Sequence, residues 1–171
     1  MKAGTMMTIE TILSILDNLE KLHKSLLRIA KEKSELIKNG DIQGIDQLLK
    51  DEQAHLAAIV QMDQSRQNAV SNYLEGKGIS MPMNPTITDL IEATPIPDTE
   101  QLTEARDRLL HAIHELKWQN DLNQKLTYQS LQFVNLSLDM VRPRTESVTY
   151  SKTGINGKKA SRDIPNFDSQ A

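Results

Sequence analysis

The sequence predicts an all-α fold: an elongated antiparallel helical hairpin followed by a long third helix, in a three-helix, coiled-coil-like bundle with a disordered C-terminal tail. Apolar residues recur at helical spacing over three stretches of about thirty residues or more. Only 4% of the 171 residues are aromatic, and most of the 7 Gly and 6 Pro lie outside these stretches, where they mark helix ends. The expected division is a helical domain over residues 1–141 and a flexible tail over 142–171.

The first helix is expected over about residues 8–38. Its apolar stripe is broad, which suits a bundle better than a narrow two-stranded zipper. The letters "NGD" end it, because Gly40 can take the left-handed conformation that terminates helices and Asp41 can cap the next helix. A tight hairpin is therefore predicted at residues 39–41.

The second helix is expected over about residues 42–74, and its apolar stripe contains three charged residues. Antiparallel pairing about the turn places His23 near Glu52, and a hydrogen bond between them is the favoured interpretation of this histidine. Asp63 and Arg66 are i,i+3 neighbours and are expected to pair on their own helix.

A connector rich in Pro and Gly follows over residues 75–98, too long for a simple loop, with room for one short helix at roughly 88–93. Asp98 and Gln101, after Pro97, form a helix start signal for a third helix over about residues 99–141. The letters "RPR" end it.

The third helix carries a core stripe that runs on through Leu131, Val134, Leu138 and Val141. Asn120 and Asn123 interrupt this stripe. Together with Asp63 and Arg66 they either fix the helix register, as buried polar groups do in coiled coils, or mark a place where the bundle opens to water. Register is the favoured interpretation.

A second apolar row lies on the opposite side of the third helix. Contiguous exposed apolar surface typically marks a partner site, and an amphipathic helix laid along such a row is one recurring mode. The alternatives are that the row packs against the 80–93 region or against a second copy of the chain. The row consists of Trp118, Leu122, Leu126, Phe133, Leu136 and Met140.

The sequence does not point to an enzyme, a metal site or a cofactor. The absence of Cys excludes disulfides and Cys-based zinc sites or nucleophiles, and no phosphate-binding Gly loop or nucleophile elbow is present. The letters "HAIHE" place His111, His114 and Glu115 on one helix, where two His at i,i+3 can bind a metal. A surface pair is favoured, because no second ligand cluster is apparent.

Charge and the N-terminal residues suggest a cytoplasmic protein. The net charge is -3, with a tail of about +3 whose basic residues are scattered, so nucleic-acid binding is not expected. The first twenty residues lack an uninterrupted apolar stretch and carry acidic residues, so neither a signal peptide nor membrane insertion is expected.

Four segments of the sequence stand out together: "LEKLHKSLLRIAKEKSELIKNGDIQGIDQLLKDEQAHLAAIVQMDQSR", "NQKLTYQSLQF", "TYSKTG" and the final "FDSQA". They resemble the FlgN-type flagellar export chaperones, which hold hook–filament junction proteins before secretion. Their order and spacing match, and the resemblance is weakest over residues 75–100.

The resemblance implies a cytosolic, non-enzymatic chaperone in bacterial flagellum assembly, part of type III protein export. It implies that the end of the third helix binds the C-terminal helices of hook-associated client proteins. It also implies that Tyr150, in "TYSKTG", docks on the cytoplasmic domain of the export gate. The runner-up is a structural or adaptor protein that forms a homodimer through the same face. The residues that correspond to the family's client site are Leu122, Leu126, Leu131, Phe133, Val134, Leu138 and Met140.

Overall fold

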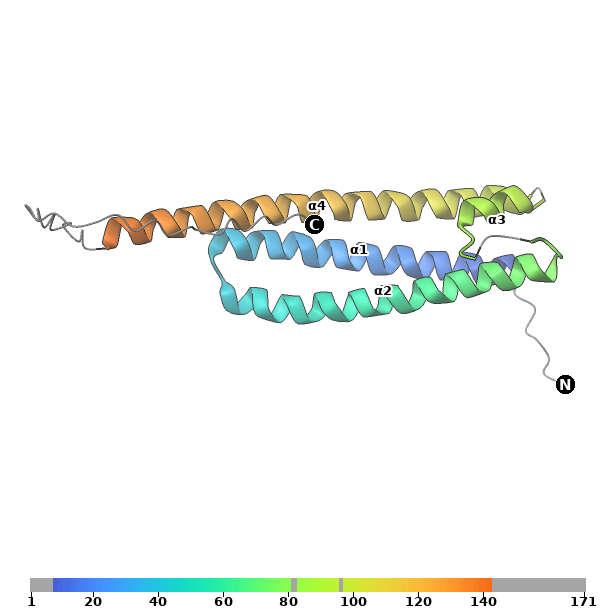
Figure 1. Cartoon of the computed structure of the whole chain (residues 1–171), viewed down its shortest axis with the longest axis horizontal. Helices are drawn as coiled ribbons and strands as arrows, with labels where there is room; N and C mark the ends of the chain where they lie inside the picture. Colours follow the sequence, from blue (N-terminus) through green and yellow to red (C-terminus); the bar gives the residue numbers. More distant parts are fainter. Residues whose placement is uncertain (1–7, 81–82, 96, 143–171) are drawn as a thin grey trace, which may run out of the picture. The chain divides into compact units, whose positions relative to one another are not determined.

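The computed structural model describes residues 8–80, 83–95 and 97–142, and within them the regular structure is helical, with no strand. This confirms the predicted all-α class. Residues 1–140 form one compact unit and residues 141–171 a second, of which only Val141 and Arg142 are described. The predicted disordered tail lies outside the described residues. The helices are α1 (Ile9–Asn39), α2 (Ile42–Gly76), α3 (Ile87–Ala93) and α4 (Asp98–Val141) (Figure 1).

The turn between α1 and α2 forms as its residues predict. Gly40 has a φ of 67°, and its N–H donates to the Ile37 carbonyl oxygen while the Asp41 N–H donates to that of Leu36. The Asp41 side chain accepts a hydrogen bond of 2.9 Å from the Gly44 N–H. These bonds satisfy backbone groups that helix ends leave unpaired, and they turn the chain back antiparallel.

The contact predicted between His23 and Glu52 is wrong. His23 Nδ1 donates to the Leu19 carbonyl oxygen at 2.7 Å, one turn back on its own helix. Glu52 pairs with Lys33 instead, at 2.7 Å. The His23 Nδ1 is already engaged by its own helix, and the charged Lys33 ammonium forms a strong charge-assisted hydrogen bond with the Glu52 carboxylate.

The start signal predicted at Asp98 is also displaced. Asp98 is the first residue of α4 rather than its cap. Its carboxylate, with that of Glu100, lies in the first turn, where negative charge is favourable near the positive end of the helix dipole. The short helix α3, by contrast, has a complete capping box between Thr86 and Asp89.

Helix α4 runs parallel to α1, as Figure 1 shows. Arg108 of α4 contacts Asp17 and Glu20 of α1 at 3.1 and 3.2 Å. Further along, the Asn123 amide donates to the Ala30 carbonyl oxygen at 2.7 Å. Residue numbers in contact therefore rise together, at sequence separations of 88 to 93. Helix α2 ends at the same end of the bundle where α4 begins, so the connector with α3 joins the two helices there (Figure 1).

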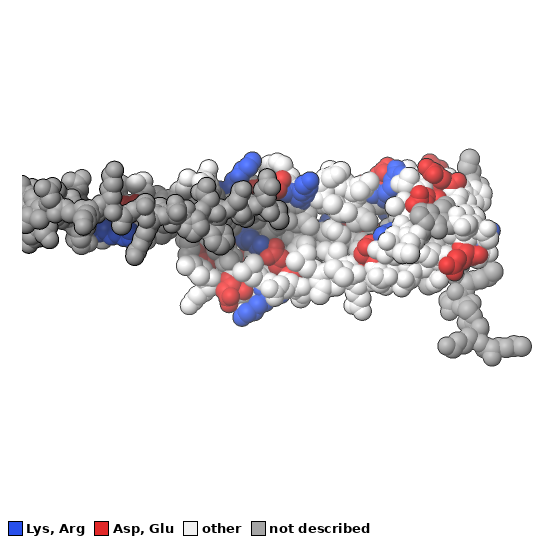
Figure 2. Space-filling model, viewed as in Figure 1, with Lys and Arg blue, Asp and Glu red and all other residues white. Residues whose placement is uncertain are grey.

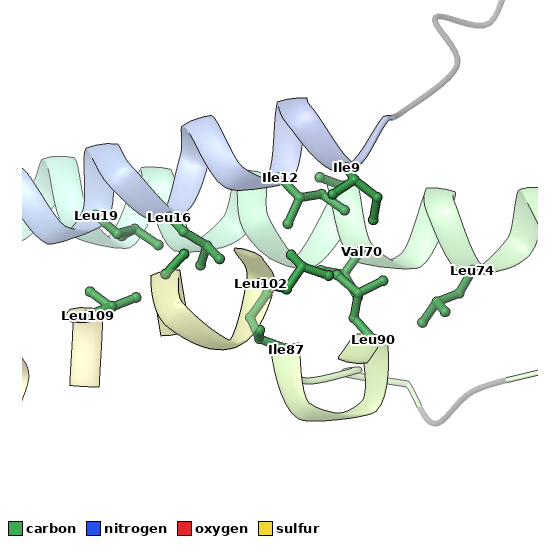
Figure 3. Close-up of a cluster of buried hydrophobic side chains, with 12 residues drawn as sticks. Ile9, Ile12, Leu16, Leu19, Val70, Leu74, Ile87, Leu90, Leu102 and Leu109 are labelled. Carbon is green, nitrogen blue, oxygen red and sulfur yellow. The ribbon is translucent and has the colours of Figure 1, made fainter. Parts of the chain in front are cut away.

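The main core lies where all four helices meet (Figure 3). Helix α3 contributes Ile87 and Leu90, which lie among residues of the other helices, so the connector closes this part of the bundle. A smaller cluster of Leu26, Leu27, Ala30 and Leu116 follows toward the hairpin turn. Beyond it the buried residues of α1 and α4 are polar, namely Ser34, Gln119 and Asn123, while α2 still buries Leu48. The largest fully buried side chains are Ile12, Leu16, Val70, Leu74, Leu90 and Leu102.

Candidate functional site

Helix α4 extends beyond the hairpin that supports it. Asn123 contacts Ala30 at a sequence separation of 93, and α1 ends at Asn39. If the same separation holds to the end of α1, Asn39 lies level with residue 132 of α4. Roughly ten residues of α4, about 15 Å of helix, then extend past the end of α1. Figure 1 shows the final turns of α4 passing the turn between α1 and α2. We call residues 128–140 the apolar end of α4.

The candidate residues on this apolar end are all exposed. The exposed fraction is 70% for Phe133 and 75% for Met140, and about half or more for the others. Leu131, Val134 and Leu138 were expected to continue the core stripe but are exposed. Leu131 lies level with the last residues of α1 and lines a groove with Ile37, whereas Val134 and Leu138 lie beyond the end of α1. Of the remaining candidates, Leu122 and Leu126 are half-buried and Trp118 is exposed. The exposed candidates on the apolar end are Leu131, Phe133, Val134, Leu136, Leu138 and Met140.

The side chains of the apolar end form two rows and one polar face when counted at about 100° per residue. The first row is Phe133, Leu136 and Met140, in line with Leu122 and Leu126. The second row is Leu131, Val134 and Leu138. The small residues Ser130 and Ser137 lie between the rows. The polar face is Tyr128, Gln132, Asn135 and Asp139.

The first row leads back along α4 to Trp118. This side chain lines a hollow of about 380 Å³ between α4 and α1, together with Leu27 and Lys31 of α1. Trp118 therefore stands about 20 Å along the helix from Phe133, separated from the apolar end by half-buried residues. It extends the first row onto the side of the bundle.

The second row leads into a groove near the turn of the α1–α2 hairpin, about 480 Å³ in volume. Lys33 and Glu52 line it as an ion pair with side chains only 16 and 17% exposed. Sequence analysis did not place Lys33 here, because no short-range pattern signals a contact between helices. The other lining residues are Ile37, Asn120, Asn123, Gln124, Thr127, Tyr128 and Leu131.

The buried polar residues between the small cluster and the groove form a connected network. Asn123 is 5% and Gln119 4% exposed. Gln119 Nε2 donates to Asn123 Oδ1 at 3.1 Å, and Asn123 Nδ2 donates to the Ala30 carbonyl of α1 at 2.7 Å. Such a bond between helices is what the register interpretation requires. The sequence did not predict that Gln119 is buried, because it lies beside the apolar stripe rather than in it. Asn120, which does belong to the stripe, is half-buried and lines the groove.

The predicted pair of Asp63 and Arg66 is confirmed, with Arg66 Nε 2.6 Å from Asp63 Oδ1. Burial raises the pKa of Asp63, but hydrogen bonds from Arg66 and Gln67 outweigh it and hold the pKa below its ordinary value. Both partners lie on α2, so this pair does not link helices as Asn123 does.

A second pair of polar side chains in the described helices lies close together but lacks the surroundings of a reactive site. Ser25 Oγ lies 2.8 Å from His55 Nε2 in a hollow between α1 and α2, a spacing that resembles a nucleophile and its base. Both residues lie in mid-helix, where backbone N–H groups are engaged in the helices' own bonds. Free backbone donors therefore do not converge there to stabilise an oxyanion.

The histidine pair of "HAIHE" lies on the surface. His111 and His114 are exposed, and His111 Nε2 lies 3.8 Å from Glu115 Oε2. Within the described part of the chain, no group of three or more His, Asp or Glu residues is arranged to hold a metal ion.

The surface charges are mixed. On the face shown in Figure 2, basic and acidic side chains lie interspersed. Among the helices described, none is both long and apolar enough to cross a membrane.

Comparison with known proteins gives one family. The family model described as FlgN protein matches residues 6–157, a range that includes Tyr150, which itself lies outside the described residues. The chain is 32% identical over 165 residues to the uncharacterized protein YvyG of Bacillus subtilis (strain 168), covering 96% of this chain and 100% of that protein. No solved structure matches the chain significantly. With the match spanning the helical bundle and its apolar end, the chain belongs to the FlgN family.

Proposed function

We propose that the chain is a cytosolic type III export chaperone. Its clients are flagellar hook–filament junction proteins, which it binds through their C-terminal helices and delivers to the export gate. Membership of the FlgN family supports this role. The observation that carries the proposal is the apolar end of α4, whose large side chains are exposed on more than one side of the helix.

The physical basis is mass action rather than catalysis. Apolar client helices that are exposed before assembly are prone to aggregate, and covering them on α4 removes apolar area from water at a gain of about 25 cal/mol per Å². Leu and Met side chains adapt their shape to a partner, which suits a surface that receives helices of differing sequence. Neither a nucleotide nor a metal is required for such binding.

Delivery is assigned to the tail. Tyr150 corresponds to the family tyrosine that docks on the cytoplasmic domain of the export gate. A segment that orders only on docking binds with reduced affinity, which favours release. We expect Tyr150→Ala to leave client affinity unchanged and to impair export in cells. Weakened client binding by this variant would contradict the separation of the two sites.

The first experiment is calorimetric titration of the full chain with peptides from the C-terminal helices of junction proteins. We expect binding of about micromolar affinity or tighter, corresponding to about -8 kcal/mol. Phe133→Glu should abolish it, because a carboxylate would be buried against an apolar helix without a partner. Gln132→Glu is the matched control, since it adds the same charge at the neighbouring residue, which lies on the polar face of α4.

Helicity decides how a loss of binding is interpreted. Phe133 is 70% exposed, so Phe133→Glu should leave the circular dichroism spectrum and the melting temperature unchanged. Unfolding of the variant would show that this side chain belongs to a core. Absence of binding by the wild type, with light scattering that shows a dimer dependent on Phe133, would support the homodimeric adaptor instead.

A further inference from the structure

The two rows of the apolar end are too far apart around α4 for one helix to cover. Leu136 in the first row and Leu138 in the second are separated by about 160° around the helix axis. A packed helix covers a stripe of about 100°. A client helix seated on one row would therefore leave the other row in water.

The second row has a specific relation to the core. Leu131, Val134 and Leu138 continue the stripe of α4 whose earlier members, such as Leu116, are buried against α1. Since α1 ends at Asn39, a helix seated on the second row would occupy the place that a longer α1 would occupy. Its end would meet the groove lined by Ile37 and Thr127, so the bundle core would continue into the client.

The first row faces a different neighbour. It continues back through Leu122 and Leu126 toward Trp118, on the side of α4 that borders Leu27 and Lys31. A helix on this row would lie alongside the bundle rather than in line with α1. The two rows thus offer two seats of different geometry on one helix.

Along the apolar end of α4 itself, both rows are flanked by neutral residues, and the nearest charged residues of α1 and α2 lie in the adjoining groove and hollow. No charged residue occurs between Lys125 and Asp139, and the polar residues beside the rows are Ser, Thr, Gln and Asn. Basic or acidic partner helices would lose hydration there without gaining an ion pair. The surface therefore fits amphipathic helices whose apolar faces are bordered by neutral polar side chains.

A second copy of this chain fits less well. In a two-fold dimer each copy uses the same patch. Pairing of two α4 ends through the first row would leave both second rows exposed, and pairing through the second row would leave both first rows exposed. Two segments of one client cover both rows in a single complex.

We infer that the apolar end of α4 holds two helical segments of one client chain at the same time, one on the Phe133 row and one on the Leu131 row, in line with α1. This inference rests on the proposed chaperone function. It adds that recognition requires a client region with two low-charge amphipathic helical segments.

A matched pair of variants tests it. Leu136→Glu and Leu138→Glu change the same residue type at similar exposure, 55 and 49%, on opposite rows. The probe is a purified fragment that contains the whole C-terminal helical region of a junction protein, titrated calorimetrically into the full chain. Each variant should weaken binding at least about tenfold, because each buries a carboxylate against one segment. Gln132→Glu, on the polar face, should bind as the wild type does.

The outcomes separate the two proposals. If the wild type binds the fragment and one of the two variants binds equally well, the two-segment inference is overturned while the chaperone function stands. If the wild type binds no fragment, both fail. A peptide with a single client helix should respond to only one of the two substitutions, and a response to both would also overturn the inference. Unchanged melting temperatures are expected, since both side chains lie on the exposed end of α4.

Discussion

Asn123→Ala should destabilise the bundle through the network that links α4 to α1. In the folded chain Asn123 is 5% exposed and bridges Gln119 to the Ala30 carbonyl oxygen. Truncation to Ala removes both bonds and leaves the Gln119 amide, itself 4% exposed, without the acceptor it uses. The loss is therefore larger than that of one exchanged hydrogen bond.

The magnitude follows from the burial of the remaining amide. A buried donor left without a partner costs about 1–3 kcal/mol. Asn123 also lines the groove near the turn of the hairpin, from which water can reach the vacated space. We therefore expect a loss of about 2 kcal/mol in the free energy of unfolding, and a melting temperature lower by about 4–8 °C for a chain of this size. Urea unfolding followed by circular dichroism measures both the midpoint and the slope.

The double variant Gln119→Leu with Asn123→Leu provides the control. It replaces both polar partners with apolar side chains, which is often nearly neutral or stabilising. We expect it to recover the stability that Asn123→Ala loses. A single variant as stable as the wild type, or a double variant as unstable as the single one, would refute the role assigned to the buried amide.

Three further predictions concern charge and backbone. The pKa of Glu20 lies below its ordinary value of 4.5, chiefly because Lys24 donates a hydrogen bond to it; Arg108 adds to this effect and burial opposes it. The contribution of Glu20 to the stability of the fold is therefore complete at a pH above 4.5 and is lost as the pH falls through the pKa of the folded state. The destabilisation by Glu20→Gln, measured by urea unfolding, should therefore vanish in acid, and persistence there would contradict the assignment. Gly40→Val should lower the free energy of unfolding by about 1–2 kcal/mol, because φ is 67° and a β-branched residue is strained in this conformation, although the added side chain meets no neighbouring atom. Gly40→Asn should largely avoid this loss, as thermal melts of the two variants would show. Client affinity should change by less than about threefold between roughly 0.05 and 0.5 M salt, and a steep decline would show that ion pairs dominate binding.

Much of the fold follows from local sequence. The helical stripes predict the long helices, and "NGD" predicts both the left-handed Gly40 and the cap at Asp41, because these depend on residues within one turn. Contacts between residues far apart in the sequence were harder to predict. Glu52 has an obvious charge, but no nearby residue in the sequence indicates its partner, and only the packing of α1 against α2 brings Lys33 within reach.

The candidate surface shows the same division. The sequence by itself determined that α4 is apolar on two sides, since spacing at 3.6 residues per turn sets which side chains share a face. Only the tertiary structure decided which of those sides is buried and where burial stops. At the offset set by Asn123 and Ala30, α1 ends while α4 continues for more than two turns, so Val134 and Leu138 lie exposed although their pattern matches that of buried Leu116. The periodicity of the sequence determines on which face of the helix a side chain lies, but its burial depends on whether another helix is long enough to reach it.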